Sequence, residues 1–548
     1  MATSRRFDSI ESMKLYDHKT NDVKWQKKWA EDAIYETPRM PGDKKAYILD
    51  MFPYPSGEGL HVGHPKGYIA TDIYSRFKRM NGYDVLHPMG WDAFGLPAEQ
   101  FALKHKVHPR TAVEKNVANF KKQLSHIGCD YDWNREINTT DPGFYKWTQW
   151  IFTKLYEKGL AYESHEPINW CPSCKTGLAN EDVNADGTCE RCDTLVEKKP
   201  LRQWVLKITD YADRMLADLD TLNWPDGVKT AQRNWIGRSE GAEFEFALVD
   251  TKIPSVKVFT TRADTLYGAT FVAISAELAS SWFDAGVISG NDIATYIKTT
   301  LEEQKKEVDY SVIPEKTGTF SGLYAINPAT KEKIPVWIAN YILGGVGTGA
   351  IMAVPAHDDR DYDFAKKFNL PITQVIDVAG KDMSLGYIIE DGVLINSGAL
   401  TSLSSSEARV RAIDMFGGSK VVKYKIQDWV FARQRYWGEP FPVVRDASGK
   451  VYMVDESELP VLLPDVESYE PTGTGESPLA AISDWVNVKG YITEKGTFKQ
   501  SANGELFTRE TNTMPQWAGS SWYYLRFLDP KNENALIDPA IEKAWGEV

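Results

Sequence analysis

AYILDMFPYPSGEGLHVGHPKGY, residues 46–68, is the stretch that decides the fold. Residues 46–51 form a short, mostly apolar run of the length of a buried strand. Prolines and glycines over residues 53–59 then break that strand. After His61-Val62-Gly63-His64, apolar residues recur at helical spacing as far as Asn81-Gly82, a favourable C-terminal cap. The sequence therefore predicts a strand, a glycine-rich turn and a helix, in that order.

The glycine-rich turn places two imidazoles at the start of the predicted helix. Helix N-termini offer backbone N–H groups to phosphate, and His61 and His64 lie about one helical turn apart. Their ring N–H groups could donate hydrogen bonds to phosphate oxygens there. Taken alone, the HxGH pattern is equally compatible with ordinary turn residues.

Length and composition limit the class of protein. The 548 residues are too many for one domain, and three or four domains are expected. No apolar run approaches the length of a transmembrane segment, so no membrane partner is expected. The net charge of −13 weakens a nucleic-acid-binding interpretation, although local basic patches can still bind RNA. Five cysteines do not suggest a disulfide framework, which fits a cytoplasmic setting.

A second helix is predicted after Thr111-Ala112-Val113-Glu114, which has the pattern of a capping box. Apolar residues follow on one helical face as far as Ile127, and Gly128 ends the helix. We assign this helix to core packing alone.

Two CxxC pairs predict a metal site. Cys171 and Cys174 form the first pair, and Cys189 and Cys192 form the second. Two such pairs a short distance apart are a strong pattern for tetrahedral Zn²⁺. The alternative, two redox pairs or chance spacing, has odds of roughly one in ten. Four thiolates leave no open coordination position, so the predicted zinc is structural.

The next motif gives the chain a family resemblance. Residues 87–99 read HPMGWDAFGLPAE and follow a strand-like run at residues 84–86. Together with MFPYPSG and HVGH, they resemble the N-terminal half of the catalytic domain of class I aminoacyl-tRNA synthetases, in wording similar to the bacterial leucyl type. Isoleucyl and valyl enzymes share HxGH but usually read GWDxHGLP, where this chain has WDAFG at residues 91–95.

The residue pattern of the sequence changes near Gly241. Short β-rich runs appear at residues 242–249 and 256–261, and this pattern continues to about Tyr424. Two motifs, FTTRADTLYG at residues 259–268 and GTGAIMAVPAHDDRDY at residues 347–362, resemble the inserted editing domain of leucyl, isoleucyl and valyl enzymes. The family usually has proline where Ala263 stands.

The editing resemblance implies a hydrolytic site. Threonines at a strand end offer hydroxyl and backbone N–H groups to a water and an ester carbonyl. Asp361 would bind the α-amino group of the tRNA-bound amino acid, and Thr265 would limit side-chain length. The implied editing residues are Thr260, Thr261, Thr265, Asp358 and Asp361. Singly, the threonines also fit plain strand propensity and the aspartates a solvated helix start.

Two later segments extend the resemblance. Residues 428–440, DWVFARQRYWGEP, resemble the family's S-R-Q-R-Y-W-G segment, with Ala432 in the serine position. Arg433 and Arg435 could meet RNA or carboxylates, or form ion pairs at a domain junction. Residues 514–524, MPQWAGSSWYY, resemble the element that lines the family's amino-acid pocket.

The implied reaction forms leucyl-adenylate from leucine and ATP, with Mg²⁺, and then transfers the leucyl group to tRNA(Leu). His61 and His64 would be the catalytic residues that stabilise the phosphates. The resemblance implies ATP-binding residues Pro55, Gly57, Gly63, His61 and His64. It implies leucine-binding residues Met51, Phe52, Tyr54, Asp92, Trp517, Ser520 and Tyr523.

The expected fold is α/β, with a class I synthetase Rossmann-like core whose parallel sheet is incomplete, a small zinc module and an inserted α/β editing domain. The expected parts are residues 1–165, the first half of the core; 166–200, the zinc module; 201–239, the return to the core and linker; 240–424, the editing domain; and 425–548, part of the second half of the core.

Family members continue through a second, lysine-rich catalytic signature and an anticodon-binding domain. We expect this chain to be a front portion that needs the remaining part for synthesis, supplied by a second polypeptide if the gene is split. Two alternatives stay open: a non-catalytic tRNA-binding fragment and a free-standing editing hydrolase.

Overall fold

The computed structural model describes residues 16–546, apart from residues 56, 58, 166, 185–186, 304–314, 343–347, 379–385 and 467. Ser56 and Gly347, which belong to two of the motifs above, fall outside the described residues. The chain divides into two compact units. The first, here the core unit, takes residues up to 179, 198–206 and from 430 onward, and the second, here the insert unit, takes residues 180–197 and 207–429.

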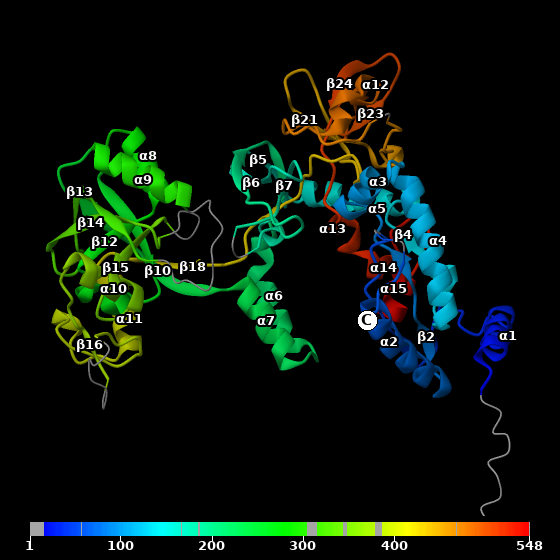
Figure 1. Cartoon of the computed structure of the whole chain (residues 1–548), viewed down its shortest axis with the longest axis horizontal. Coiled ribbons are helices and arrows are strands. Elements are labelled where there is room, and N and C mark those ends of the chain that lie inside the picture. The colour runs from blue at the N-terminus through cyan, green and yellow to red at the C-terminus, as the bar shows by residue number, and fades with distance from the viewer. Residues whose placement is uncertain are drawn as a thin grey trace, which may run out of the picture. The chain divides into compact units, whose positions relative to one another are not determined.

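After a first helix, α1 (His18–Glu31), the core unit contains the predicted strand, turn and helix (Figure 1). Strand β1 (Lys45–Tyr47) and strand β2 (Asp84–Leu86) pair in parallel, with Lys45 opposite Asp84 and Tyr47 opposite Leu86. Helix α2 (Gly63–Met80) connects them and ends at Asn81, as predicted. The strand is shorter than the apolar run at residues 46–51, because the chain leaves the sheet after Tyr47.

Helix α2 turns its polar side inward. Its buried residues are Tyr68 and Ser75, whereas the apolar residues whose spacing predicts the helix are mostly exposed. Met80 is 88% exposed. The exposed apolar residues at steps of three and four are Ile69, Ile73, Phe77 and Met80. The predicted helix is confirmed, but hydrophobic burial is not what fixes its orientation.

Helix α4 corrects the predicted helix start. It runs over Pro109–Ile127, and the side chain of His108 caps it by accepting a hydrogen bond from the backbone N–H of Arg110. The capping box predicted at residues 111–114 is therefore wrong, because Pro109 already occupies the first turn, where its missing N–H is tolerated. The predicted stop at Gly128 is confirmed, with φ at 86°.

The other elements of the core unit surround these. Helices are α1 (His18–Glu31), α3 (Leu96–His105), α5 (Pro142–Glu157), α12 (Ser483–Val486), α13 (Trp517–Ser520), α14 (Tyr523–Arg526) and α15 (Pro539–Trp545). Its short strands are β3 (Gly90–Trp91), β4 (Ile137–Asn138), β5 (Ala161–Ser164), β6 (Pro167–Cys171), β7 (Thr176–Leu178), β8 (Glu197–Pro200), β9 (Gln203–Leu206) and β19 (Trp429–Val430). Strands β3 and β4 pair in parallel. An antiparallel sheet contains β20 (Val443–Arg445), β21 (Val451–Met453), β22 (Asn487–Ile492), β23 (Phe498–Gln500) and β24 (Glu505–Arg509).

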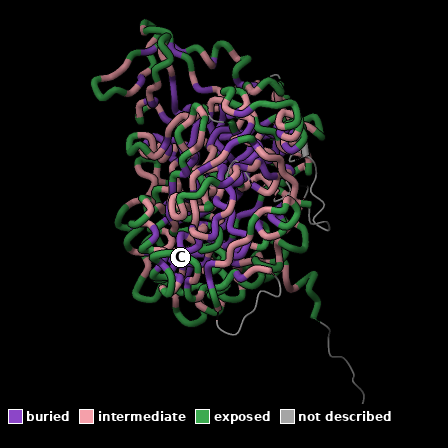
Figure 2. The backbone as a smooth tube through the Cα atoms, turned by 90° about the vertical axis from the view of Figure 1, so that its left-hand side faces the viewer, coloured by how far each residue is buried: buried purple, intermediate pink, exposed green. Residues whose placement is uncertain are grey.

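One aromatic-rich cluster forms the core of this unit. Trp91, Phe94, Tyr145, Trp437 and Trp522 are buried members drawn from distant parts of the sequence. Along the chain as a whole, Figure 2 shows buried segments in purple with exposed turns in green around them. The late segments of the chain therefore complete the core that the early segments begin.

The insert unit is built on a seven-stranded sheet in the order β11-β10-β13-β14-β12-β15, with β18 paired to β10. The predicted strands at residues 242–249 and 256–261 are confirmed as β10 and β11. The bounds are β10 (Ser239–Leu248), β11 (Ser255–Thr260), β12 (Phe271–Ile274), β13 (Gly318–Ile326), β14 (Lys333–Ala339), β15 (Ala350–Ala353), β16 (Ile376–Asp377), β17 (Val393–Leu394) and β18 (Ser419–Lys423). Its helices are α6 (Ala212–Thr221), α7 (Asp226–Ile236), α8 (Ala276–Asp284), α9 (Asn291–Glu303), α10 (Asp359–Phe368) and α11 (Ser405–Met415).

Helices cover both faces of this sheet. Val272 and Ile274 of β12 belong to the larger cluster, with residues of α8, α9 and α11. Phe271 and Ala273, which alternate with them, pack with Phe364 of α10. This alternation is the period of two expected for a strand buried on both faces. Among the described residues of the whole chain, no helix is long and apolar enough to cross a membrane.

Candidate functional site

The start of α2 holds the two histidines of the HxGH motif against each other. Their ring centroids are 3.9 Å apart and the planes are inclined by 33°. The backbone N–H of Gly63 donates to Nδ1 of His61 at 3.1 Å, and the backbone N–H of His61 donates to Nδ1 of His64 at 3.2 Å. Because Nδ1 accepts a hydrogen bond in both rings, each ring carries its proton on Nε2. The pair thus presents two N–H donors at a helix N-terminus.

Gly63 is required between the two histidines. A Cβ atom built on it would lie 2.8–2.9 Å from ring atoms of His61, so a side chain would displace that ring. Burial, and to a lesser degree the neighbouring His61, lowers the pKa of His64. His64 is therefore a neutral hydrogen-bond donor at pH 7.

Helix α4 holds the turn that precedes the histidines. Asn116 Nδ2 donates to the carbonyl oxygen of Pro55 at 2.9 Å, and Gln123 Oε1 accepts from the backbone N–H of Leu60 at 2.7 Å. A Cβ on Gly59 would lie 2.7 Å from the Gln123 side chain. The core packing predicted for this helix is confirmed by its buried apolar face, and these two hydrogen bonds add a second role. Gly57, by contrast, has open space at its Cα.

Five of the seven residues implied for leucine binding divide into two groups. Phe52 is buried and stacks on Tyr523, with ring centroids 4.1 Å apart and planes inclined by only 6°. Met51, Tyr54 and Trp517 are instead exposed, Met51 by 82%. The structure thus brings one aromatic pair together as a wall and leaves the other three side chains at the surface.

Asp92 is a buried carboxyl group with an unused oxygen. Its backbone N–H donates to the carbonyl oxygen of Pro53 at 3.1 Å, which ties it to the turn. Burial raises the pKa of Asp92 to about 8, and the neighbouring Gln516 and Ser520 side chains oppose that rise. Among the described residues, neither Asp92 Oδ1 nor Gln516 Nε2 has a hydrogen-bond partner. One buried acceptor and one buried donor therefore lie beside each other in this site.

Glu439 is a buried neighbour that the sequence interpretation missed. It accepts a hydrogen bond from Thr148 Oγ1 at 2.9 Å, and Thr148 in turn accepts from Trp522 Nε1 at 3.0 Å. Burial, together with the charge of Asp92, raises the pKa of Glu439 well above its ordinary value. A Cβ on Gly519 would lie 2.7 Å from Glu439 Oε1. Glu439 thus shapes the segment that precedes Ser520.

Arg435 forms an ion pair in the interior rather than a surface for RNA. Its Nη1 lies 2.9 Å from Glu99 Oε1, and both side chains are buried. Glu99 Oε2 also accepts from the backbone N–H of Trp437 at 2.9 Å. The sequence leaves RNA, carboxylates and an ion pair at a domain junction open for Arg435, and the structure shows an ion pair with a carboxylate of its own unit. Arg433 donates to the carbonyl oxygens of Val430 and Ala432.

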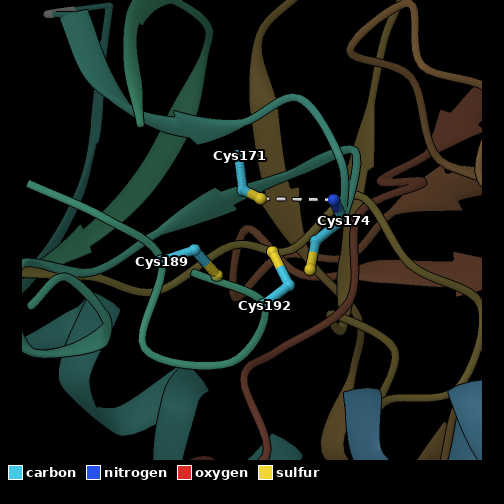
Figure 3. A group of neighbouring side chains, drawn as sticks. All are labelled: Cys171, Cys174, Cys189 and Cys192. Carbon is cyan, nitrogen blue, oxygen red and sulfur yellow. Dashed lines mark hydrogen bonds between the residues drawn. The ribbon is translucent and has the colours of Figure 1, made fainter. Parts of the chain in front are cut away.

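The four cysteines of the two CxxC pairs meet, as Figure 3 shows. Their sulfur atoms all lie within 4.8 Å of one another, and three of the four residues are buried. The backbone N–H of Cys174 donates to Cys171 Sγ at 3.2 Å. Each pair closes a tight turn followed by a residue with positive φ, Lys175 at 55° and Asp193 at 53°. Tetrahedral Zn²⁺ at about 2.3 Å from each sulfur requires S–S separations of about 3.8 Å, so the donor set fits zinc.

The insert unit contains a pocket of about 220 Å³. All five residues implied for editing line it, and they come from three elements: the end of β11, the 3-10 turn at Ala263–Gly268 and the start of α10. Its lining is Phe259, Thr260, Thr261, Arg262, Thr265, Ile351, Met352, Val354, His357, Asp358, Arg360 and Asp361. Two motifs about 90 residues apart in sequence therefore form one cavity.

Asp361 lies buried in the wall of this pocket. Tyr341 Oη donates to its Oδ1 at 2.9 Å, and the backbone N–H of Val354 donates to its Oδ2 at 2.8 Å. Burial and the nearby charge of Asp358 raise the pKa of Asp361 to about 7, against the effect of those two hydrogen bonds. No sequence signal indicates Tyr341 as a neighbour of Asp361, since it follows β14 without a motif.

The remaining polar groups of the pocket are fixed by local bonds. Thr265 is buried, and its hydroxyl donates to the carbonyl oxygen of Arg262 at 2.8 Å. Arg262 pairs with Asp264 at 3.0 Å. Asp358 caps α10 by accepting from the backbone N–H groups of Arg360 and Asp361. A cavity with a carboxyl group, threonine hydroxyls and arginines can hold an amino group and polarise an ester.

His357 lines the pocket, but its ring nitrogens bind backbone groups that stabilise the fold. Its Nδ1 donates to the carbonyl oxygen of Ile388 at 2.8 Å, and its Nε2 accepts from the backbone N–H of Val375 at 2.9 Å. Both ring nitrogens are therefore engaged by backbone. Burial lowers the pKa of His357, so the ring is neutral at pH 7.

Comparisons with known proteins agree with this division. Residues 24–240 match the family model of class I tRNA synthetases (I, L, M and V), and residues 233–416 match that of the leucyl-tRNA synthetase editing domain. The crystal structure of the ternary complex of Agrobacterium radiobacter K84 agnB2 LeuRS, tRNA and LeuAMS is similar, with 35% sequence identity and a TM-score of 0.77. The match covers 97% of this chain and 62% of that chain. The chain thus spans less than two thirds of that relative's length.

Proposed function

The chain belongs to the leucyl branch of the class I tRNA synthetases, and on that premise we propose that it attaches leucine to tRNA(Leu) and hydrolyses mischarged tRNA. The observation that carries the synthetic half is the buried Asp92 oxygen, which has no hydrogen-bond partner in the part of the chain that the structure describes. A buried acceptor of this kind is costly unless a ligand satisfies it, and the ammonium group of an amino acid would do so. Gln516 Nε2 beside it would donate to the carboxylate end.

In the proposed first step, a leucine carboxylate oxygen attacks the α-phosphorus of ATP. The new bond joins that oxygen to phosphorus, the bond to the β-phosphate oxygen breaks, and pyrophosphate leaves. A reaction of this kind needs positioning and charge stabilisation rather than a side-chain nucleophile. The Nε2–H groups of His61 and His64 would donate to the phosphate oxygens, while Mg²⁺ would add charge. A terminal hydroxyl of tRNA then takes the leucyl group and AMP leaves.

The proposed roles of the other side chains follow from their contacts. Phe52 and Tyr523 would pack against the leucine side chain, and Ser520 would support Asp92. Pro55, Gly57 and Gly63 would let the nucleotide approach the turn. Met51, Tyr54 and Trp517 are exposed, so we propose for them only a position at the rim of the site, over bound substrate.

We propose that the insert pocket is the editing site. Asp361 would hold the α-amino group, and the hydroxyls of Thr260 and Thr261 would orient a water and the ester carbonyl. The ester bond to tRNA breaks, water supplies the new oxygen, and the free amino acid leaves. Near-isosteres such as isoleucine or norvaline are the expected targets, because one methylene is worth only about 1–3 kcal/mol in the synthetic pocket.

The parts of the chain are assigned to match. We propose residues 1–165, 201–239 and 425–548 for the catalytic core and its linker, 166–200 for the zinc module and 240–424 for editing. The pairing of β10 with β18, which brackets residues 239–423, supports the last boundary.

Two assays on one preparation test the proposal. Pyrophosphate exchange with leucine, ATP and Mg²⁺ reports adenylate formation, and release of isoleucine or norvaline from mischarged tRNA(Leu) reports editing. The protein is purified as its cell makes it, with any polypeptide that copurifies. Deacylation without exchange would replace the proposal by an editing hydrolase, and loss of both activities with tRNA binding retained would leave a binding protein.

We also propose one structural Zn²⁺ on the four thiolates, which a reducing cytoplasm would preserve. Metal analysis should find about one equivalent per chain, and Cys189→Ser should lower it. Its unfolding temperature should fall as well, because a structural zinc site contributes to folding. A protein without zinc but with a full complement of disulfides would refute this site.

A further inference from the structure

A charged cluster lies under α2 where the proposed chemistry makes no direct use of it. His87 follows β2 directly, and Asp50 lies three residues after β1, so both stand at the carboxyl ends of two paired parallel strands. His87 is completely buried. Its Nδ1 lies 2.6 Å from Asp130 Oδ1, and its Nε2 lies 3.3 Å from Asp50 Oδ2. The imidazole therefore bridges two carboxylates.

The contacts of the carboxylates determine the charge of His87. Asp50 Oδ2 also accepts from Tyr131 Oη at 2.7 Å, and Asp130 Oδ2 accepts from Arg79 Nε at 3.2 Å. Ionised carboxylates only accept hydrogen bonds, so both ring nitrogens must donate and the ring is an imidazolium. Burial would lower the pKa of His87, but the bonds and charges of Asp130 and Asp50 outweigh it and raise that pKa.

The same two carboxylates accept hydrogen bonds from side chains of α2. Thr71 Oγ1 lies 2.9 Å from each oxygen of Asp50, and Ser75 Oγ donates to Asp130 Oδ2. Thr71, Ser75 and Arg79 are spaced by four residues and therefore share one face of the helix. This is the inward polar face described above, so polar contacts rather than apolar packing hold the helix on the strands.

The charges around His87 balance. Asp72 accepts from the backbone N–H of Asp130 at 2.8 Å and pairs with Arg76 at 2.9 Å. The cluster thus contains three cations, Arg76, Arg79 and His87, and three anions, Asp50, Asp72 and Asp130. Tyr131 and Cys129 also face the cluster, and burial raises both pKa values, that of Cys129 to about 12. Loss of the imidazolium charge would leave one buried anion in excess.

We propose that His87 is a positioning residue for adenylate formation: by bridging Asp50 and Asp130, it fixes the register of the helix whose first turn carries His64 and whose start abuts His61. This inference rests on the proposed function for its consequence in catalysis. A helix that is held by hydrogen bonds can take only discrete positions on the strands, whereas a helix held by apolar contacts can slide. A displacement of about 1 Å at a reacting centre can cost about a hundredfold in rate.

The first test compares His87→Asn with a matched control. Glu510 is also buried in a charged cluster of the core unit, with Arg202 and Arg445, and Glu510→Gln removes that charge without touching α2. His87→Asn should lower kcat of pyrophosphate exchange about tenfold to a hundredfold, with KM for ATP and leucine changed less than about twofold. Glu510→Gln should lower the unfolding temperature and leave kcat within about twofold.

A second variant separates position from stability. His87→Asn/Asp130→Asn removes an anion with the cation and restores the charge balance, so the unfolding temperature should recover relative to His87→Asn. The bridge stays broken, so kcat should stay low. If kcat recovers together with stability, His87 has a merely structural role and the proposal is overturned.

Hydrogen exchange provides a readout that does not depend on activity. Amides of residues 63–80 should exchange at least about tenfold faster in His87→Asn than in the wild type or in Glu510→Gln. If the wild type shows no pyrophosphate exchange, the proposed function fails, and these amides alone decide whether His87 fixes the helix. If the amides of residues 63–80 exchange hydrogen in His87→Asn at the wild-type rate, the inference is overturned, even if the protein proves to be an active synthetase.

Discussion

Asp92 in the core unit and Asp361 in the insert unit are buried carboxyl groups proposed to receive the same chemical group, an ammonium, yet the protein supports them differently. Asp92 keeps one oxygen without a partner among the described residues, and its pKa is raised to about 8. Both oxygens of Asp361 accept hydrogen bonds, from Tyr341 and Val354, and its pKa is raised to about 7. The less the protein satisfies the carboxylate, the more its ionisation depends on the ligand.

This difference suits the two proposed tasks. The synthetic pocket must select a free amino acid, so a carboxyl group that ionises fully only with ammonium bound adds to selection. The editing pocket receives its amino acid tethered to tRNA, and a carboxylate already supported by the protein needs less from the ligand. The predictions below set the two sites against each other.

The largest expected effect is that of Asp92→Asn. Truncating one partner of a buried charge pair costs about 2–5 kcal/mol, so leucine-dependent pyrophosphate exchange should fall about thirtyfold to several thousandfold. The loss should appear mainly as a higher KM for leucine. Deacylation of mischarged tRNA by the same variant serves as the control and should be unchanged.

Asp361→Ala should show a smaller loss at the other site. Hydrogen bonds to charged groups contribute about 1.5–3 kcal/mol, so release of isoleucine from mischarged tRNA should slow about tenfold to a hundredfold. Pyrophosphate exchange should stay at the wild-type rate. Equal sensitivity of both activities to this variant would contradict the assignment of separate sites.

Thr265→Ser probes the size of the editing pocket. It keeps the hydroxyl that donates to Arg262 and removes only a methyl group. Correct leucyl-tRNA should then be hydrolysed faster by about tenfold, in line with the value of one methyl group in a pocket. Survival of leucyl-tRNA in both Thr265→Ser and Thr265→Ala would show that Thr265 is not the steric limit.

The pH dependence should differ between the sites in slope. Only the ionised carboxylate pairs with ammonium, so binding improves as pH rises toward the pKa of each group. Between pH 5.5 and 7, affinity for leucine should rise almost tenfold per unit, because the pKa of Asp92 is about 8. Deacylation should instead begin to level off near pH 7, where Asp361 ionises. Titration calorimetry and deacylation rates measure the two profiles.

The smallest expected effect is on stability. The folded-state pKa of Asp92 lies above its ordinary value of 3.8, so the stability that the protonated group contributes is lost as pH rises from that value through about 8. Asp92→Asn cannot ionise and should gain a few degrees in unfolding temperature relative to the wild type at pH 9, and less at pH 5. Thermal unfolding of both proteins at the two pH values checks the sign.

Much of this architecture could be predicted from the sequence. The class I core, the inserted α/β domain and the two CxxC pairs rest on contiguous motifs, and the family matches and the cysteine cluster bear them out. The stop of α2 at Asn81 and of α4 at Gly128 follow from local capping chemistry, which sequence encodes directly.

What could not be predicted depends on neighbours distant in sequence. The apolar stripe of α2 predicts a helix but not which side faces inward, because Asp50 and Asp130 reverse the usual preference for burial. Gln516 lies within a quoted motif, yet its position beside Asp92, more than 400 residues away in sequence, has no local signal. Tyr341 follows a strand without a motif, so its bond to Asp361 appears only in the structure.

The antiparallel pairing of β10 with β18 has a consequence for folding kinetics. Ser239 lies opposite Lys423, and Glu243 lies opposite Ser419, so the two ends of the insert are side by side. Before this ribbon forms, the core segments that end at residue 206 and resume at residue 430 are joined by a loop of more than 200 residues. Afterwards, the ribbon closes residues 239–423 into a separate loop, and only the shorter flanking segments still separate the two parts of the core. Loop-closure entropy grows by only about 0.6 kcal/mol per doubling of length, but it opposes every non-local contact of the core. If the insert folds first, it therefore shortens the loop between the core segments and accelerates folding of the core unit.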